Sequence, residues 1–236
     1  MQIKSGGVEV DLKWLGHSGF LIKNNKTGKN IYIDPYRLSG GGEGEDLENA
    51  DVILITHSHY DHCSIEDLRK IVKHGTVIVA TPDSQSKLVK FERDIHIKII
   101  EPNQEIVIGN LKVLSLPAYN IDKSFHAKDE HWVGFLLKIN DLLIYHAGDT
   151  DKIPEMQKLT GFKGKGEGRV YFVALLPIGG RFTMDFEEAA EAAQMIKPDL
   201  AIPMHYGSIV GDSSDAEEFV RLCEEKGINA KILEKS

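Results

Sequence analysis

The chain has 236 residues and a formal net charge of −8, with 42% hydrophobic and 27% charged residues. This is the balance of an ordinary globular protein, and we expect one domain over residues 1–236, with a small-molecule partner in preference to nucleic acid. Two cysteines exclude a disulfide framework, and the lack of a membrane-length apolar run or a signal-peptide core predicts a cytoplasmic protein without a membrane partner.

Short apolar runs rich in β-branched residues predict strands along most of the chain. The predicted strands are Val8–Trp14, Gly19–Lys23, Asn30–Asp34, Val52–Thr56, Val77–Ala80, His96–Ile99, Glu105–Ile108, Leu111–Leu116, Val133–Ile139, Leu142–Tyr145, Val170–Leu175, Leu200–Pro203 and, as a last candidate, Ala230–Leu233. Two of the breaks between them, Gly109-Asn110 and Asn140-Asp141, predict β-hairpins.

Helices are fewer and lie between the strands. Ser64 begins a capping-box pattern that predicts a helix to about Lys73. Asp185 can cap a helix over Phe186–Ile196, and a third helix is predicted over Asp215–Lys226. The strand-rich first part and the alternating last part together predict an α/β fold with helices packed outside stacked mixed sheets.

Two glycine-rich stretches, Leu38–Asp46 and Thr160–Gly168, interrupt this pattern. Neither has the spacing of a phosphate-binding loop, so both are expected to be surface loops. A mobile lid is the functional alternative for Leu38–Asp46.

The segment His57–His62 carries the strongest chemical signal. Three imidazoles and the carboxylate of Asp61 fall within six residues, directly after the apolar strand over Val52–Thr56. Imidazole nitrogen and carboxylate oxygen suit zinc, and also manganese or iron. On an extended chain His57 and His59 point the same way and can reach one metal, while Asp61 and His62 can face a neighbouring position.

Three further strands end in an acid or a histidine. Asp34, Asp149 and His205 each follow an apolar run. Ligands commonly gather at the carboxyl ends of strands, so we expect these residues and the His57–His62 segment to meet in one crevice.

The spacing His57-x-His59-x-Asp61-His62 resembles the signature of the metallo-β-lactamase superfamily. The resemblance implies an αββα four-layer sandwich, in which two mixed β-sheets are flanked by helices. It also implies that Asp149 bridges two metal ions and that His205 is the last metal histidine. Asp34 would support a ligand histidine through a hydrogen bond. Segments Trp14–Phe20 and Leu176–Gly180 resemble the UPF0173 branch, and the similarity extends from about residue 10 to residue 207.

One departure from the family pattern concerns the third histidine of the first metal site. The position where the branch places it is Asn120, a poor metal ligand. We therefore expect His126, six residues further on, to replace it, with His131 as a weaker candidate.

The resemblance implies a metal-dependent hydrolase with two divalent ions, of which zinc is the first choice over manganese or iron. His57, His59 and His126 would hold one ion, Asp61, His62 and His205 the other, and a metal-bound water would attack an ester, lactone, amide or phosphodiester. Asp61 and His17 are the catalytic candidates: Asp61 could orient the nucleophile, and His17 is a conceivable proton donor.

The alternatives are an iron-dependent oxidoreductase, a nuclease of the same fold, and a non-catalytic metal-binding protein. A second copy of the same chain, in a homo-oligomer, is a further partner that the sequence allows.

Overall fold

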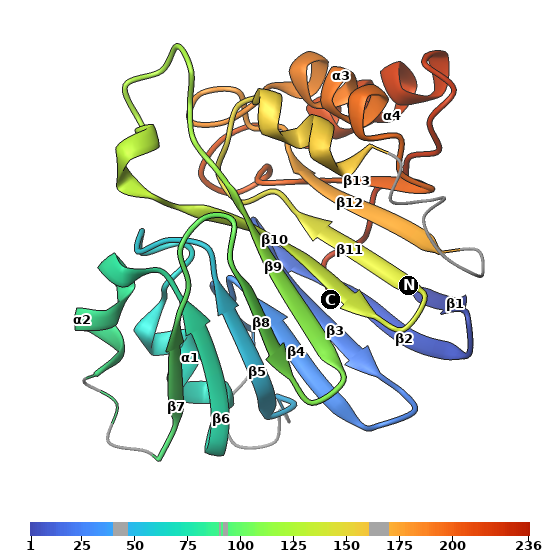
Figure 1. The fold of residues 1–236 in the computed structure, drawn as a ribbon. Helices are drawn as coiled ribbons and strands as arrows, with labels where there is room; N and C mark the ends of the chain where they lie inside the picture. Colours follow the sequence, from blue (N-terminus) through green and yellow to red (C-terminus); the bar gives the residue numbers. More distant parts are fainter. Residues whose placement is uncertain (40–46, 90, 92–93, 161–169) are drawn as a thin grey trace.

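The computed structural model describes residues 1–39, 47–89, 91, 94–160 and 170–236, and shows two β-sheets with helices on their outer sides (Figure 1). Within these residues, one sheet has the order β1-β2-β3-β4-β5-β6-β7 and the other the order β13-β12-β11-β10-β9-β8. The predicted sandwich of two mixed sheets is therefore confirmed.

The first sheet is built from consecutive strands. They are β1 (Gln2–Ser5), β2 (Val8–Gly16), β3 (Gly19–Asn24), β4 (Lys29–Ile33), β5 (Ala50–Ile55), β6 (Val72–Ala80) and β7 (His96–Ile99). Strands β1 to β4 pair antiparallel, and β4 to β7 pair parallel, so β4, β5 and β6 all end at the same edge.

The second sheet begins with two hairpins and ends with parallel strands. Its members are β8 (Glu105–Ile108), β9 (Leu111–Pro117), β10 (Val133–Ile139), β11 (Leu142–His146), β12 (Tyr171–Pro177) and β13 (Leu200–Met204). The predicted hairpins β8–β9 and β10–β11 are confirmed, and β11, β12 and β13 run parallel.

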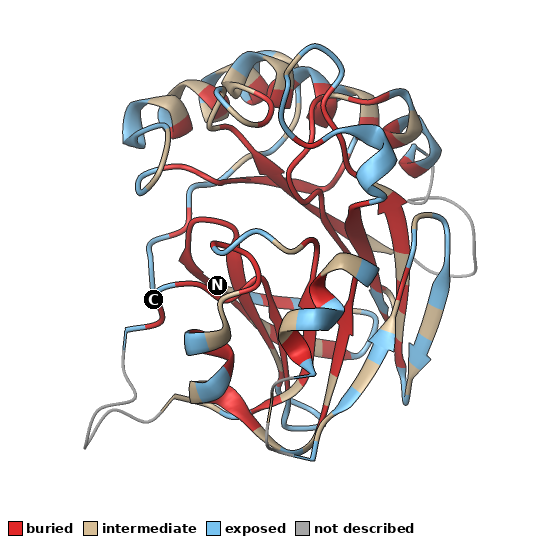
Figure 2. Ribbon diagram, turned by 90° about the vertical axis from the view of Figure 1, so that its left-hand side faces the viewer, coloured by how far each residue is buried: buried red, intermediate tan, exposed pale blue. Residues whose placement is uncertain are grey.

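The core lies between the sheets and under the helices, where the strands are buried (Figure 2). Along β2, Val10 and Leu12 are buried and alternate with half-buried Asp11 and Lys13, as a strand with one covered face requires. Strands β11 and β13 are buried at every position, because helices cover their second face.

The main helices cover the outer faces of the two sheets. Helix α1 (Ile65–Ile71) lies against the first sheet with the short helix α2 (Gln85–Leu88), and α3 (Phe186–Ile196) and α4 (Ser213–Glu225) cover the second (Figure 1). The predicted Ser64 cap is present, since its hydroxyl accepts a hydrogen bond from the Asp67 amide. Helix α3 has the predicted bounds and a capping box at Asp185.

Several predicted element bounds were wrong. Helix α1 ends at Ile71, since the chain enters β6 at Val72. Helix α4 begins at Ser213, because Asp212 and not Asp215 is its cap. The candidate strand Ala230–Leu233 forms only an isolated bridge, between Ala230 and Ala201.

Other short elements had no clear sequence signal. Strand β1 and helix α2 were not predicted, and in the part of the chain that the structure describes the short 3₁₀ helices Pro82–Ser84, Lys128–Glu130 and Pro154–Leu159 connect longer elements. The candidate lid over Leu38–Asp46 falls mainly on residues 40–46, and the second glycine-rich stretch on residues 161–169, which lie outside the described residues.

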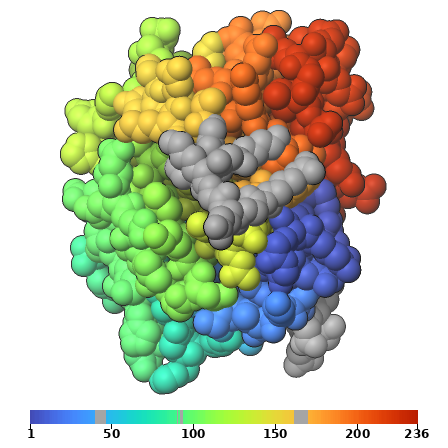
Figure 3. Space-filling model, turned by 45° about the vertical axis from the view of Figure 1, so that its right-hand side comes forward, coloured from blue at the N-terminus to red at the C-terminus, as the bar shows by residue number. Residues whose placement is uncertain are grey.

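Strand β1 also contacts the second sheet, at the turn that joins two of its strands. The Ser5 hydroxyl donates a hydrogen bond to the Asp141 carbonyl, in the turn between β10 and β11. On this face the N-terminal residues lie beside that turn, with the C-terminal helices above them (Figure 3). Among the described helices none has both the length and the apolar character needed to cross a membrane.

Candidate metal centre

The carboxyl ends of β4 and β5 position the first half of the site. Strand β5 ends at Ile55 and leads through Thr56 into the His57–His62 segment. Asp34 follows β4, and its carboxylate accepts hydrogen bonds from the Thr56 amide at 2.9 Å and the Thr56 hydroxyl at 2.5 Å. The same carboxylate lies 2.8 Å from His62 Nδ1, so Asp34 turns His62 Nε2 toward the centre of the site.

Strands β11 and β13 deliver the second half. Asp149 follows β11 across Ala147 and Gly148, and His205 comes directly after β13. Gly148 has φ +68°, and a Cβ there would lie 2.7 Å from the Val133 carbonyl oxygen. Only glycine therefore suits this turn, which brings Asp149 to the same edge as the His57–His62 segment.

Asp149 is the centre of the cluster. Its carboxylate is 3.1 Å from His205 Nε2, 3.3 Å from His62 Nε2, 3.3 Å from His126 Nε2 and 4.0 Å from His57 Nε2. One buried carboxylate thus faces four imidazoles from three different chain segments.

The candidate ligand atoms form two main groups among the described residues. Nitrogens of His57, His59 and His126 lie within 4.8 Å of one another. Atoms of His17, Asp61, His62 and His205 form a second group within the same limit, and Asp149 groups with His57 and His62. The grouping parallels the two expected ligand sets, with His17 as an additional member of the second.

Buried atoms without hydrogen-bond partners show that these residues suit a cation. Within the described part of the chain, His57 Nε2, His62 Nε2 and Asp149 Oδ1 are buried and lack any such partner. Leaving three polar atoms unpaired in one place is costly unless a ligand satisfies them. Since two are imidazole nitrogens and one is a carboxylate oxygen, a divalent metal ion fits the set.

The protonation states agree with this chemistry. Burial, reinforced by neighbouring imidazoles, lowers the pKa of His57 well below its usual value, and burial also lowers the pKa of His126. Burial alone would raise the pKa of Asp149, but the nearby His205 and His62 hold it well below its usual range. The carboxylate is therefore ionised and both rings are neutral at pH 7, the forms that bind metals.

His62 differs from the other imidazoles in its protonation. Burial alone would lower its pKa, but the carboxylates of Asp149 and Asp34 outweigh burial and raise the pKa well above the usual value. In the metal-free protein a protonated His62 therefore compensates the buried charge of Asp149.

His126, and not Asn120, faces Asp149. Its Nδ1 donates a hydrogen bond to the Phe182 carbonyl at 2.8 Å, which leaves Nε2 to face Asp149. The Asn120 side-chain amide donates to the same carbonyl at 2.8 Å. Asn120 therefore lies beside His126 and helps to hold the loop that carries it.

His131 lies apart from the centre. It is exposed, borders a surface cavity with Glu155 and Lys158, and belongs to none of the metal-capable groups of described residues. Of the two candidates for the third ligand, the structure brings only His126 to Asp149.

His17 contacts the second ligand group directly. Its Nε2 is 3.0 Å from Asp61 Oδ2, and its ring centroid is 4.0 Å from that of His205. Burial lowers the pKa of His17 to about 4 despite the hydrogen bond to Asp61, so the ring is neutral at pH 7. A neutral ring with its proton on Nε2 donates to Asp61 and accepts at Nδ1 from the Ser208 hydroxyl, 3.3 Å away.

Two residues of the site had no sequence signal. The Trp132 ring lies 4.6 Å from the His57 ring and 4.7 Å from the His59 ring, and its indole N–H donates to Asp83. Ser208 is the partner of His17 described above. Both contacts cross long sequence separations, which a local pattern cannot reveal.

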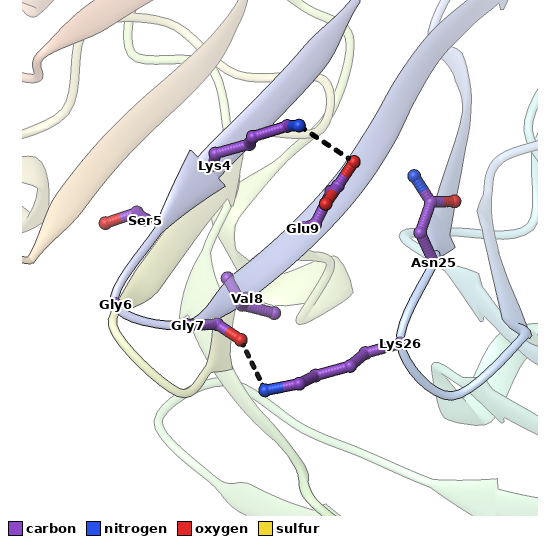
Figure 4. A pocket seen from close by; sticks show the side chains of 8 residues that line it. All are labelled: Lys4, Ser5, Gly6, Gly7, Val8, Glu9, Asn25 and Lys26. Atoms are coloured by element: carbon purple, nitrogen blue, oxygen red, sulfur yellow. Dashed lines mark hydrogen bonds and ion pairs between the residues drawn. The ribbon is translucent and has the colours of Figure 1, made fainter.

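A cavity of about 550 Å³ lies away from the candidate metal centre, among the turns that join β1 to β2 and β3 to β4 (Figure 4). Its two lysines are already paired, Lys4 with Glu9 and Lys26 with the Gly7 carbonyl, and its lining has no histidine. This surface hollow is therefore not the functional site.

Comparisons with known proteins agree with the fold and identify the family. The model of the Beta-lactamase superfamily domain matches residues 11–205. A UPF0173 metal-dependent hydrolase of Pyrococcus horikoshii is 35% identical over 223 residues, covering 92% of this chain and 93% of the relative. One from Thermococcus onnurineus is 36% identical with the same coverage.

Solved structures give the same answer. The crystal structure of a Parabacteroides distasonis protein matches with a TM-score of 0.83 and 28% identity, covering 100% of this chain and 98% of the other. A metallo hydrolase of Ignicoccus hospitalis matches with a TM-score of 0.74 and 26% identity, covering 96% of each chain. The chain therefore belongs to the β-lactamase superfamily and, within it, to the UPF0173 family of metal-dependent hydrolases.

Proposed function

We propose that this hydrolase binds two divalent metal ions around Asp149, with zinc as the favoured metal. With these ions bound it would cleave an ester, lactone, amide or phosphodiester bond of a small molecule. His57, His59 and His126 would hold one ion, Asp61, His62 and His205 the other, and Asp149 would bridge them. The observation that carries the proposal is the buried Asp149 carboxylate, which has imidazole nitrogens of four histidines within 4.0 Å. When bound, the ions lower the pKa of a coordinated water from about 15.7 to about 7 and polarise the substrate oxygen.

The protein's own residues hold the reacting groups. Asp34 fixes His62 and the Thr56 amide, so the His57–His62 segment is rigid behind the reaction site. Asp61 would orient the nucleophilic water with the carboxylate oxygen that His17 does not use. The Nε2–H of His17 would keep Asp61 in place by donating to Oδ2, and because the ring is neutral at pH 7, His17 would act through this hydrogen bond and not as the acid that protonates a departing group.

Metal analysis of protein purified without added metal tests the proposal, together with a screen of nitrophenyl esters and bis-(4-nitrophenyl) phosphate. We expect about two metal equivalents per chain and hydrolysis of at least one substrate class. Asp149→Asn should lose most of the metal and slow hydrolysis at least ~100-fold, because the shared carboxylate is removed.

Asp122→Asn is the matched control, because Asp122 is exposed on the loop that carries His126. It should keep the metal content and the rate of the parent. A parent protein unable to take up zinc, manganese or iron, or an Asp149→Asn variant with unchanged metal and rate, would contradict the proposal.

A further inference from the structure

A small side pocket adjoins the candidate metal centre on the side of His17. It measures about 80 Å³ and lies between the end of β2, the chain after β4, the chain after β13, and the C-terminal segment. His17 belongs both to its wall and to the second ligand group. A group bound in this pocket would therefore be separated from Asp61 and His205 by a single imidazole ring.

Two cationic side chains border the pocket. They are Arg37, which follows β4, and Lys235, near the C-terminus. Among the described residues, no carboxylate lies within ion-pair distance of either cationic group. Because the chain as a whole carries a charge of −8, two cations without a partner among the described carboxylates would favour an anion at this small pocket against the overall field.

Both cationic side chains are exposed, and contacts with the fold place their backbones beside the pocket. Lys235 forms a β-bridge with Trp14, and the next residue donates its amide to the Trp14 carbonyl at 2.9 Å. The stem of Lys235 lies over Gly16, where a Cβ would be only 3.1 Å from Lys235 Cε. Glycine at position 16 thus makes room for the lysine at the pocket.

Arg37 is fixed from two sides. Its amide donates to the Asp67 carboxylate at 2.8 Å, and its guanidinium carbon lies 5.1 Å from the centre of the Tyr36 ring. Stacking on an aromatic ring leaves the edge of a guanidinium free to bind the two oxygens of a carboxylate or phosphate.

The size of the pocket restricts its ligand. One water molecule needs about 10–15 Å³ of cavity volume in this measure, so about 80 Å³ has room for a group of several heavy atoms. A carboxylate or a phosphate group has that size, and arginine and lysine are the side chains that bind such groups.

We propose that this side pocket binds a carboxylate or phosphate group of the substrate, so that the hydrolysed molecule is an anion whose charged group lies apart from the bond that is cleaved. The assignment rests on the proposed hydrolysis at Asp149 and specifies the substrate class. Arg37 and Lys235 would bind the charged group, and His17 would separate it from the metal ions.

Binding of defined anions tests the pocket without relying on turnover. Calorimetric titrations of the metal-loaded protein with glutarate and with phenyl phosphate give a dissociation constant for each anion. We expect at least one anion to bind, and Lys235→Met and Arg37→Met each to weaken it about 10-fold or more. The preferred anion distinguishes a carboxylate from a phosphate ligand.

Lys231→Met is the matched control, because Lys231 is an exposed lysine of the same C-terminal segment and does not line the pocket. It should bind the anion within about twofold of the parent, since only a distant charge is lost. Equal affinities for the parent and Lys235→Met would overturn the proposal, as would equal losses in Lys235→Met and Lys231→Met.

Measurements of turnover distinguish the side-pocket proposal from the proposed hydrolysis. The kcat/KM ratio of mono-4-nitrophenyl glutarate to 4-nitrophenyl acetate should favour the anionic ester and should fall about 10-fold in Lys235→Met. A parent that prefers the neutral ester would overturn the side-pocket proposal. A Lys235-dependent anion affinity in a protein that cleaves no substrate would support the pocket and contradict the hydrolysis alone.

Discussion

Four residues at or beside the candidate metal centre have left-handed backbone conformations. The φ angles are +51° at His17, +42° at Asp34, +52° at His126 and +60° at His205. Such a conformation costs a non-glycine residue about 1–2 kcal/mol and persists only where surrounding contacts enforce it. The enforcing contacts are present: the His205 amide donates to the His17 carbonyl, and the Asn120 amide to the His126 carbonyl. The fold thus accepts local strain in order to aim these side chains inward.

The third ligand of the first metal can be tested by removing each candidate histidine. His126→Ala should lower the metal content by about one equivalent per chain, because the His126 Nε2 faces Asp149 at 3.3 Å. His131→Ala should keep the metal content of the parent, because His131 is exposed and lies apart. Elemental analysis measures the metal content of the two variants. Equal metal loss in both would refute His126 as the third ligand.

Close packing at Gly179 controls the position of His205. A Cβ at position 179 would lie 2.6 Å from the His205 carbonyl oxygen and 3.0 Å from its Nδ1. Gly179→Ala should therefore displace the imidazole and weaken zinc binding about 10–100-fold, measured by competition with a chromophoric chelator.

The same Cβ would also come within 2.5 Å of the Val210 side chain. The double variant Gly179→Ala/Val210→Ala removes that second clash and should not restore zinc affinity. Full recovery in the double variant would mean that Val210, and not His205, transmits the effect.

At the scale of elements, Asp67 joins helix α1 to the loop after β4. Its carboxylate accepts the backbone amides of Arg37 and Leu38 at 2.8 and 3.0 Å, and Lys70 donates to it at 2.9 Å. Burial would raise the pKa of Asp67, but hydrogen bonds from Ser64, Lys70 and these amides outweigh burial and lower it. One helix residue therefore holds the chain segment that presents Arg37.

The pH dependence of stability should report this lowered pKa. The folded pKa lies below the unfolded value of about 3.9, so the charged form adds stability at neutral pH that is lost as the pH falls through the folded pKa. Asp67→Asn should lower the free energy of unfolding by about 1–3 kcal/mol at pH 7, and the difference should shrink below about pH 4.

Urea unfolding at several pH values measures this effect. Glu66→Gln is the control on the same helix, because its side chain is 87% exposed, and it should change stability by less than about 0.5 kcal/mol. A difference between Asp67→Asn and the parent that stays constant from pH 7 to pH 3 would contradict the prediction.

At the scale of the whole molecule, the candidate centre connects the two sheets. The His57–His62 segment follows β5 of the first sheet, whereas Asp149 and His205 follow β11 and β13 of the second. A metal ion bound by both sets would therefore stabilise the packing of one sheet on the other.

Removal of the metal should consequently lower the melting temperature. A ligand at 100 times its dissociation constant adds about 2.7 kcal/mol, which corresponds to roughly 5–10 °C for a chain of this size. Scanning calorimetry before and after chelation, with zinc added back, measures the shift. Asp149→Asn should show little change on chelation, and a full shift in that variant would place the stabilising metal elsewhere.

The sequence alone determined the class of fold and most of the candidate chemistry. Period-two apolar runs and hairpin breaks are local signals, and β8 to β11 formed where these signals predicted them. The His57–His62 segment, Asp149 and His205 were recognisable because each follows a buried strand within three residues. Their assignment as metal ligands stays a prediction, which the geometry around Asp149 supports.

Only the tertiary structure decided which distant side chains meet. It brought His126 and not His131 to Asp149, it placed Ser208 and Trp132 against histidines far away in the sequence, and it placed Lys235 in the same pocket lining as His17. The path of these loops depends on left-handed residues, glycine contacts and hydrogen bonds between segments that share no local pattern. Such contacts form only after both sheets have packed, so no periodicity within one segment could have encoded them.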